Sequence, residues 1–235
     1  MSYIGCYVGC IAYADDLILL SGSLTQLQVM LQLCENEAQN MDLIFNCKKS
    51  CLFKVGVSFN EDVNILHLNG GDVCWVDKLK YLGIYIVKDR IFNTDTSWVI
   101  HKIYATANAI DCRTKNVQEL SRLCVLEAFA LPILSYGCDA IFISRTNLQK
   151  MNVCWNNVFR KVFKMKMWES VKCLQFFCGR LDFVHTVLDR KFKFLNGLYK
   201  TNCLVMKECF RYLQCDAKFR KLCKDYNVVV DSDCL

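Results

Sequence analysis

Residues 6–20 read CYVGCIAYADDLILL, and this stretch decides how the first part of the chain folds. Two apolar runs rich in Ile, Tyr and Leu flank a polar centre formed by Ala14, Asp15 and Asp16. Apolar strands on both sides of a short polar stretch are typical of a β-hairpin. Exposed turns more often pair Asp with Gly or Asn, so two adjacent carboxylates at the tip are unusual. The pair predicts a binding site for a hard cation such as Mg²⁺; an ordinary turn is the alternative interpretation.

A helix and several short strands are predicted to follow the hairpin. Ser23 and Gln26 form a capping-box pattern, and apolar residues at helical spacing predict an amphipathic helix over 24–41. Alternating apolar residues and turn signals predict short strands at 43–45, 50–55, 63–68, 73–76 and 81–87, with an Asn-Gly-Gly-Asp turn at 69–72. Hairpin, helix and strands in this order predict an α+β fold with an antiparallel sheet.

The pattern changes near residue 96, where apolar residues begin to recur at intervals of three and four. This spacing predicts a mainly helical second part. The expected helices cover 97–113, 117–130, 147–163, 168–177, 183–199 and 204–224. Within 123–143 we expect a buried helix followed by a strand. A boundary within 88–96 gives two domains, 1–92 and 93–235.

Positive charge is concentrated in the second part of the chain. Residues 1–144 hold 11 Lys/Arg and 15 Asp/Glu, whereas residues 145–224 hold 18 Lys/Arg and 5 Asp/Glu. The basic part is either a solvated helical surface or a surface that faces phosphate groups. Its densest cluster consists of Arg160, Lys161, Lys164 and Lys166.

Four motifs in order give the chain a resemblance to a known family. They are Tyr13-Ala14-Asp15-Asp16-Leu17 with its following helix, MDLIFNCKKS at 41–50, KYLG at 80–83 and LPILSYG at 131–137. In this order they resemble the reverse transcriptases of non-LTR (LINE-type) retrotransposons. The resemblance implies an RNA-directed DNA polymerase, with a partial palm subdomain at 1–92 and a helical, thumb-like region with a C-terminal extension at 93–235.

The resemblance also implies roles for residues near the acidic pair. Asp15 would be the metal-binding carboxylate, Asp16 would support it, and magnesium would be the metal of the complete enzyme. Tyr13 would lie near the primer terminus, and Lys49 would approach the triphosphate and help the pyrophosphate to leave. Without the family, Tyr13 is an ordinary strand aromatic and Lys49 a solvated loop lysine.

Contacts with the nucleic acid follow from the same resemblance. Leu82 and Gly83 would hold the primer strand, because glycine permits a close approach of the backbone. Taken alone, Gly83 could mark a bulge and Leu82 could be a core residue. The basic cluster, defined as Arg160, Lys161, Lys164 and Lys166, would bind the backbones of an RNA template and a DNA primer.

The chain contains only some of the carboxylates that a polymerase metal site needs. Two-metal phosphoryl transfer needs a further carboxylate from an earlier strand, and no acidic residue precedes Asp15. We therefore expect a fragment that lacks the fingers and the first catalytic aspartate and is inactive alone. A retained nucleic-acid-binding module and a structural or interaction protein without catalysis are the alternatives.

The composition argues against several other classes of protein. The apolar run of 3–14 is too short to span a membrane, and 123–143 contains Glu127, Pro132 and Asp139. We expect no signal peptide, no membrane segment and an intracellular protein, nuclear or cytoplasmic. The 17 cysteines are odd in number and the chain is long enough to fold without disulfides, so we expect reduced thiols. They include no C-x-x-C pair, which argues against a zinc site.

Overall fold

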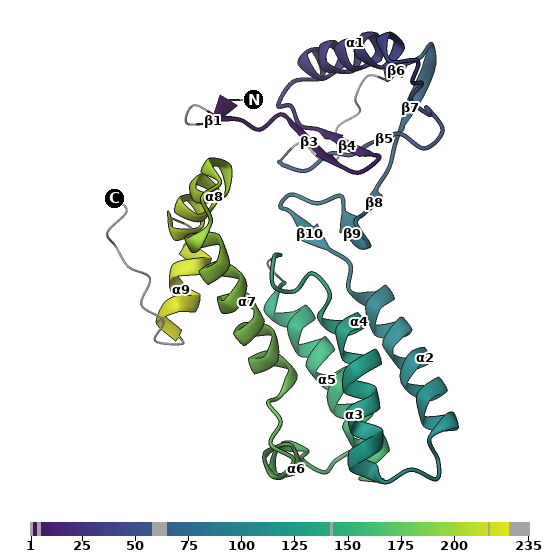
Figure 1. Cartoon of the computed structure of the whole chain (residues 1–235), viewed down its shortest axis with the longest axis vertical. Coiled ribbons are helices and arrows are strands. Elements are labelled where there is room, and N and C mark those ends of the chain that lie inside the picture. The colour runs from purple at the N-terminus through teal and green to yellow at the C-terminus, as the bar shows by residue number, and fades with distance from the viewer. Residues whose placement is uncertain (1, 4–5, 58–64, 142, 216, 226–235) are drawn as a thin grey trace. The chain divides into compact units, whose positions relative to one another are not determined.

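The computed structural model describes residues 2–3, 6–57, 65–141, 143–215 and 217–225. The chain divides into two compact units, Met1–Asp95 and Thr96–Leu235, which Figure 1 colours from purple to blue and from teal to yellow. The first unit combines short strands with one helix, and the second is helical in the part that the structure describes. This is the α+β class that the sequence predicted. The sequence placed the change at 92/93, three residues before the division between the units.

The first unit begins with two small antiparallel hairpins. Strand β1 (Ser2–Tyr3) pairs with β2 (Cys6–Tyr7), and β3 (Cys10–Tyr13) pairs with β4 (Asp16–Leu19). The second hairpin is the one predicted around the acidic pair. Its register places Tyr13 opposite Asp16, so the loop contains only Ala14 and Asp15.

Helix α1 (Leu24–Asn40) covers a small sheet and is fixed to it by a side-chain amide. Leu24, Leu27 and Leu31 pack on the core of this sheet, as their helical spacing predicted. The Gln28 amide donates to the backbone carbonyl of His67 at 3.0 Å and accepts from the His67 N–H at 2.9 Å. Two such bonds hold the helix in one position along strand β6 (Leu66–Leu68).

The predicted capping box at the start of α1 is wrong. Ser23 occupies the N-cap but makes no capping bond with its side chain. Instead, the Ser21 hydroxyl accepts from the Ser23 N–H at 3.1 Å and donates to the Ser23 carbonyl at 2.9 Å and to the Gln26 side-chain oxygen at 3.4 Å. The Ser21 hydroxyl therefore takes the Ser23 N–H that a capping box would give to the Gln26 side chain.

The sheet beneath α1 has the order β5-β7-β6. Strands β6 and β7 (Gly71–Trp75) form the predicted hairpin around Asn69 and Gly70, whose φ angles of 49° and 71° are those of a type I′ turn. Strand β5 (Cys51–Leu52) pairs with β7 in parallel, whereas the sequence predicted only antiparallel pairing. A long connection separates β5 from β7, and such a connection allows the parallel direction.

Two further strand predictions in the first unit are wrong. Residues 43–46 are irregular, because the chain reverses at Asp42 (φ 56°) and leaves Leu43 and Ile44 exposed. The single strand predicted over 81–87 is a hairpin, with β8 (Lys78–Tyr81) antiparallel to β9 (Ile84–Val87) and β10 (Asn93–Thr94) on the other side of β9. The turn between β8 and β9 interrupts the apolar run.

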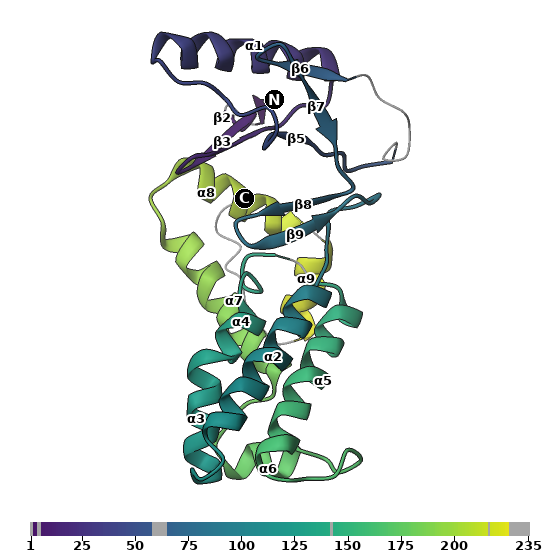
Figure 2. The same ribbon diagram turned by 90° about the vertical axis from the view of Figure 1, so that its right-hand side faces the viewer.

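The second unit is built from helices, shown from two sides in Figures 1 and 2. They are α2 (Ser97–Arg113), α3 (Glu119–Phe129), α4 (Leu131–Ser135), α5 (Arg145–Val162), α6 (Lys172–Phe177), α7 (Phe183–Lys200), α8 (Leu204–Cys215) and α9 (Ala217–Asp225). Three details correct the sequence predictions. Residues 136–140 form turns instead of a strand, α6 begins four residues later than predicted, and the predicted helix 204–224 is divided into α8 and α9.

Two apolar cores stabilise this unit. The larger core joins α2, α3, α4 and α5 around Ile103, Leu126 and Phe159, and it includes Phe183 at the start of α7. The smaller core joins the end of α7 to α8 and α9 through Leu195, Leu198, Phe210 and Phe219. Within the described residues, we find no helix with the length and apolar character that a bilayer crossing requires.

Candidate functional site

The acidic pair lies at the tip of the β3–β4 hairpin. Tyr13 ends β3, Asp16 begins β4, and Asp15 lies between them in the two-residue loop. The side chains of all three residues are exposed, that of Tyr13 by 61%. Two carboxylates and one aromatic ring therefore project from a single tight turn into solvent, where a cation and a ligand can reach them.

The backbone of this turn adopts a conformation that L-amino acids rarely use. Ala14 has a φ of 50°, whereas Asp15 is not among the residues with positive φ. A positive φ at the first loop position alone is the pattern of a type II′ turn, in which glycine is the usual residue. Here the conformation orients the carboxylate that follows it. Strained residues of this kind tend to occur at functional sites.

Lys49 lies on a second turn, which follows the irregular residues 43–46. Its N–H donates to the backbone carbonyl of Asn46 at 3.1 Å and to the Asn46 side-chain oxygen at 3.3 Å, and its side chain is exposed. The Ser50 hydroxyl closes the same turn through the Asn46 carbonyl at 3.0 Å. These bonds explain the spacing of Asn46 and Lys49 in the sequence, because the asparagine fixes the backbone that carries the lysine.

Leu82 and Gly83 form a third turn, between β8 and β9. Their φ angles are 44° and 80°, and two consecutive positive φ angles define a type I′ turn. Glycine accommodates this conformation without strain, whereas leucine rarely adopts it. The Leu82 side chain is 37% exposed, so it is not a core residue. Tyr81 pairs with Ile84, so Gly83 lies in the turn and not in a bulge of a strand. The turn presents the backbone of both residues at the edge of the unit.

Sequence reasoning did not include the charged residues beside this turn. The ammonium groups of Lys78 and Lys80 lie 4.5 and 5.7 Å from the centroid of the Tyr85 ring. Lys78 also forms an ion pair with Asp95. Lys80 was visible in the sequence as the first residue of KYLG, but only the hairpin shows that it shares a face with Lys78 and Tyr85.

The first unit thus holds the candidate residues on three turns. Tyr13, Asp15 and Asp16 share one turn, Lys49 lies on the second, and Leu82 and Gly83 form the third. In the described part of the chain, no group of three or more His, Cys, Asp or Glu side chains could hold a metal ion. Asp15 and Asp16 still suit magnesium chemically, because this ion needs only one or two protein carboxylates when substrate phosphates complete its coordination.

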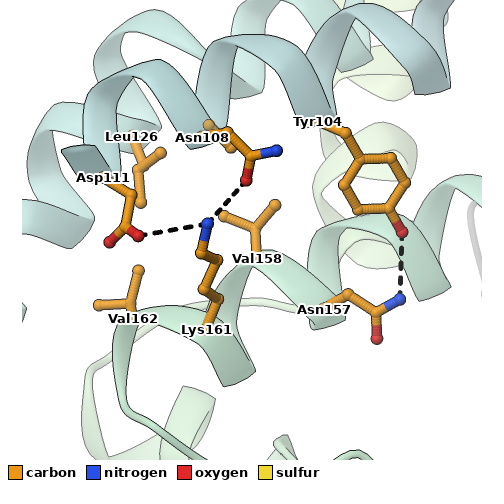
Figure 3. A pocket seen from close by; sticks show the side chains of 9 residues that line it. Tyr104, Asn108, Asp111, Leu126, Asn157, Val158, Lys161 and Val162 are labelled. Atoms are coloured by element: carbon orange, nitrogen blue, oxygen red, sulfur yellow. Dashed lines mark hydrogen bonds and ion pairs between the residues drawn. The ribbon is translucent and has the colours of Figure 1, made fainter.

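The basic cluster lies at the C-terminal end of α5, in the other unit. Lys161 reaches α2, where its ammonium group contacts the carboxylate of Asp111 at 3.2 Å and the side-chain oxygen of Asn108 at 2.7 Å (Figure 3). Arg160 is half-buried and donates to the Glu169 carbonyl at 3.1 Å and to Asn157 at 2.9 Å. Both residues therefore connect parts of the fold, which leaves less of their charge for an external phosphate.

The other two basic residues extend beyond the helix. The Lys164 N–H bonds to the Lys161 carbonyl, and the Met165 N–H to the Arg160 carbonyl at 2.9 Å, which together form a Schellman motif. Lys164 occupies the left-handed position of this motif, with a φ of 54°, and its side chain is exposed. Lys166 is also exposed, and its ammonium group lies 5.4 Å from the centroid of the Trp168 ring.

A small hollow lies between α2 and α5 next to Lys161 (Figure 3). Tyr104, Asn108, Asp111, Asn157 and Lys161 contribute its polar groups, and the Tyr104 hydroxyl accepts from the Asn157 amide at 3.1 Å. The cavity volume is about 40 Å³, which is room for a water molecule rather than for a substrate. It belongs to the packing of the two helices.

Comparison with known proteins gives one match. No curated protein and no solved structure matches the chain. The one match is to a family model, and it covers the three turns of the first unit and ends before the helical unit begins. Residues 3–86 match the model of the family described as reverse transcriptase (RNA-dependent DNA polymerase).

Proposed function

We propose that this chain serves RNA-directed DNA synthesis in a non-LTR retrotransposon, and that its first unit carries the metal-binding hairpin of the polymerase palm. The observation that carries the proposal is the acidic turn of Tyr13, Asp15 and Asp16, which lies within the 84 residues that match the family model. Neither feature would be sufficient alone, because acidic turns are common and a family match does not identify a site.

In this proposal each of the three turns has a separate task. Asp15, with help from Asp16, holds magnesium, which would neutralise phosphate charge and activate the attacking primer hydroxyl when it is bound. The Tyr13 ring packs against the sugar or base at the primer terminus. Lys49 places a mobile positive charge near the triphosphate, and the Leu82–Gly83 turn supports the primer backbone.

The helical unit supplies contacts with the template and primer. Between 145 and 224 the chain carries 18 basic and 5 acidic residues, and such an excess favours binding to phosphate backbones without reading sequence. The structure favours Lys164 and Lys166 over Lys161 for this task, because Lys161 already faces Asp111 and Asn108.

Binding to an RNA–DNA hybrid tests this assignment. The 235-residue chain should bind a fluorescent hybrid of about 16 base pairs, with an affinity that falls steeply as the salt concentration rises. Lys164→Glu and Lys166→Glu should weaken binding uniformly across sequences, by about tenfold each at low salt. Lys150→Glu is the matched control, since Lys150 is an exposed lysine on the same helix α5 but outside the basic cluster.

Two results of this experiment would contradict the proposal. One is the absence of hybrid binding at low salt. The other is an equal loss of affinity in the Lys150→Glu control and in the two cluster variants. If the second unit alone, residues 96–235, bound as well as the whole chain and Asp15→Asn changed nothing with magnesium and nucleotide present, a nucleic-acid-binding module without catalysis would be the better description.

Polymerase activity requires a carboxylate opposite the acidic pair. Residues 1–14 contain no Asp or Glu, so the strands before the hairpin cannot provide it. We therefore expect the 235-residue chain to show no primer extension with magnesium and deoxynucleotides. Extension that is abolished by Asp15→Asn would show that a carboxylate elsewhere in the chain completes the site.

A further inference from the structure

Three aromatic side chains of the helical unit are almost fully exposed. Trp168 is 80% exposed, Phe176 is 81% exposed and Phe177 is 83% exposed. They lie in the loop after α5 and in α6, at the end of the unit where Figures 1 and 2 both show α6. Large apolar side chains exposed to this extent within ten residues of the chain are the type of group that binding surfaces use. We call these three residues the aromatic surface.

The fold of α6 directs its two phenylalanines outward. Val171 and Gln175 are buried, Leu174 packs on the main core, and the Gln175 amide donates to Asn156 of α5 at 3.1 Å. These contacts determine which side of the short helix faces the core. Phe176 and Phe177 must therefore lie on the other side. Their ring centroids are 6.1 Å apart with an interplanar angle of 71°, so the rings offer separate faces.

Positive charge accompanies the aromatic surface. Lys166 lies 5.4 Å from the centroid of the Trp168 ring, and Lys172 is exposed one helical turn before Phe176. Between 160 and 181 the chain contains six Lys/Arg and a single acidic residue, Glu169. The Glu169 carboxylate accepts from the Lys166 N–H at 2.9 Å, and this bond shapes the loop that carries Trp168.

We propose that the aromatic surface binds single-stranded nucleic acid, with bases stacked on Trp168, Phe176 and Phe177 and with phosphates near Lys166 and Lys172. Exposed rings interleaved with cations are the chemistry that proteins use for single strands, because every base has a π-face. The proposal deepens the proposed function, on which it rests. It assigns the unpaired part of a template or product strand to this surface, which shares Lys166 with the basic cluster that binds the hybrid.

A membrane surface fits these observations less well. An interfacial helix buries a long apolar face, whereas α6 has only six residues and Trp168 lies outside it. Trp168 is separated from the two adjacent phenylalanines by a stretch that contains Glu169, Ser170 and Lys172. Such spacing suits a chain of alternating bases and phosphates better than a continuous hydrocarbon layer.

Fluorescence anisotropy with the full 235-residue chain tests the proposal. The probes are labelled 12-nucleotide oligo(U) and oligo(dT), whose comparison separates RNA from DNA, and a hybrid duplex. Trp168→Ala and the double change Phe176→Ala/Phe177→Ala should each weaken single-strand binding about five- to 100-fold. Trp168→Phe should retain most of the affinity, because a ring remains at this position. Hybrid binding should change less than threefold in all of these variants.

Phe129→Ala is the matched control. Phe129 is a 66% exposed phenylalanine of α3, in a stretch without Lys or Arg from 123 to 144. This change should leave both affinities unaltered. Because all of these side chains are exposed, the variants should unfold at the temperature of the wild-type chain.

Other outcomes would overturn the proposal in distinguishable ways. If the aromatic variants bound oligo(U) and oligo(dT) like the wild type while hybrid binding remained intact, the aromatic surface would have another role and the proposed function would stand. If neither single strands nor the hybrid bound, the proposed function would fail as well. Aromatic-dependent binding to vesicles of anionic lipid, without binding to single strands, would assign the surface to a membrane.

Discussion

At the scale of single residues, Lys164 combines a structural cost with an exposed charge. Its φ of 54° at the end of α5 belongs to the left-handed region, where glycine is the common residue of a Schellman motif. Lys164→Gly should therefore raise the free energy of unfolding by about 1 kcal/mol. Chemical denaturation of this variant measures the gain. Lys164→Ala removes the same charge but keeps the Cβ atom, and equal stability of the two variants would contradict this explanation.

Arg122 is a buried charge on which the packing of α2 against α3 depends. Its guanidinium group is 7% exposed and donates to the Asp111 carboxylate at 3.3 Å and to the carbonyls of Lys115 and Val117 at 3.1 Å. Arg122→Met leaves the carbonyls of Lys115 and Val117 without this donor and Asp111 with Lys161 alone, and it should cost about 3 kcal/mol of stability.

Lys161→Met provides the comparison for Arg122. Lys161 contacts the same carboxylate but is 48% exposed, so water can replace it and the cost should stay below about 1 kcal/mol. Urea denaturation of both variants measures the difference. Equal losses of stability in Arg122→Met and Lys161→Met would show that burial does not determine how much each ion pair with Asp111 contributes.

Cys138 makes the stability of the second unit sensitive to alkaline pH. Burial raises the pKa of its thiol from 9.0 to about 12, and the nearby Asp139 carboxylate acts in the same direction. Between these values the folded chain keeps a proton that the unfolded chain loses. The stabilisation is therefore complete below pH 9 and disappears as the pH rises toward 12, by about 1.4 kcal/mol per pH unit.

The Cys138→Ala variant isolates this effect from other groups that titrate above pH 9. Urea unfolding at pH 8 and pH 10.5 should show a decrease in stability that is about 2 kcal/mol larger for the wild type than for the variant. Parallel pH dependence of the two proteins would refute the assignment to Cys138.

At the scale of elements, the β8–β9 hairpin depends on the turn of Leu82 and Gly83. A type I′ turn favours Asn-Gly at its centre, so Leu82→Asn should stabilise the first unit by about 1 kcal/mol. Gly83→Ala should destabilise it by a similar amount, since alanine is strained at a φ of 80°. Thermal unfolding of the whole chain, followed for the transition of residues 1–95, measures whether each variant raises or lowers the stability of the first unit. A loss of stability in Leu82→Asn would mean that packing of the leucine outweighs its backbone strain.

This hairpin also shows where sequence patterns fail. Residues 81–87, YLGIYIV, contain no charged side chain, and a continuous strand fits this pattern as well as a hairpin does. The positive φ angles at Leu82 and Gly83 distinguish the hairpin from a continuous strand. A leucine in the sequence does not predict a positive φ angle. By contrast, Asn69-Gly70 is a strong turn signal, and the hairpin predicted there formed.

In the second unit, the presence of the helices was easier to predict than the residues at which they begin and end. The range 97–113 agrees with α2, because a long amphipathic pattern specifies a helix almost by itself. Helix α4 was not predicted, and its Pro132 lies in the first turn of this new helix, where proline is well tolerated. The contacts of Arg160 with Glu169 and of Lys161 with Asn108 and Asp111 could not be predicted, because these partners follow no local pattern.

At the scale of the whole molecule, each unit contains its own apolar core. The second unit has the larger core around Ile103 and Phe159 and a smaller one around Phe210. Residues 96–235 should therefore fold alone and unfold cooperatively, with the helical content that the whole chain shows in this region. Circular dichroism and calorimetry of this truncated protein test the expectation. A broad transition without a heat-absorption peak would mean that the helices need residues 1–95 to pack.

The central claim is that the acidic turn holds a divalent cation for nucleotidyl transfer, and manganese binding tests it most directly. Mn²⁺ should be added to the whole chain with an RNA template, a DNA primer and a non-hydrolysable deoxynucleotide, and proton relaxation of the bound nucleotide measured. Asp42→Asn changes an exposed aspartate of another turn in the same unit and is the control. We expect strong relaxation that Asp15→Asn abolishes and Asp42→Asn preserves. Relaxation that is absent, or equal in the two variants, would contradict it.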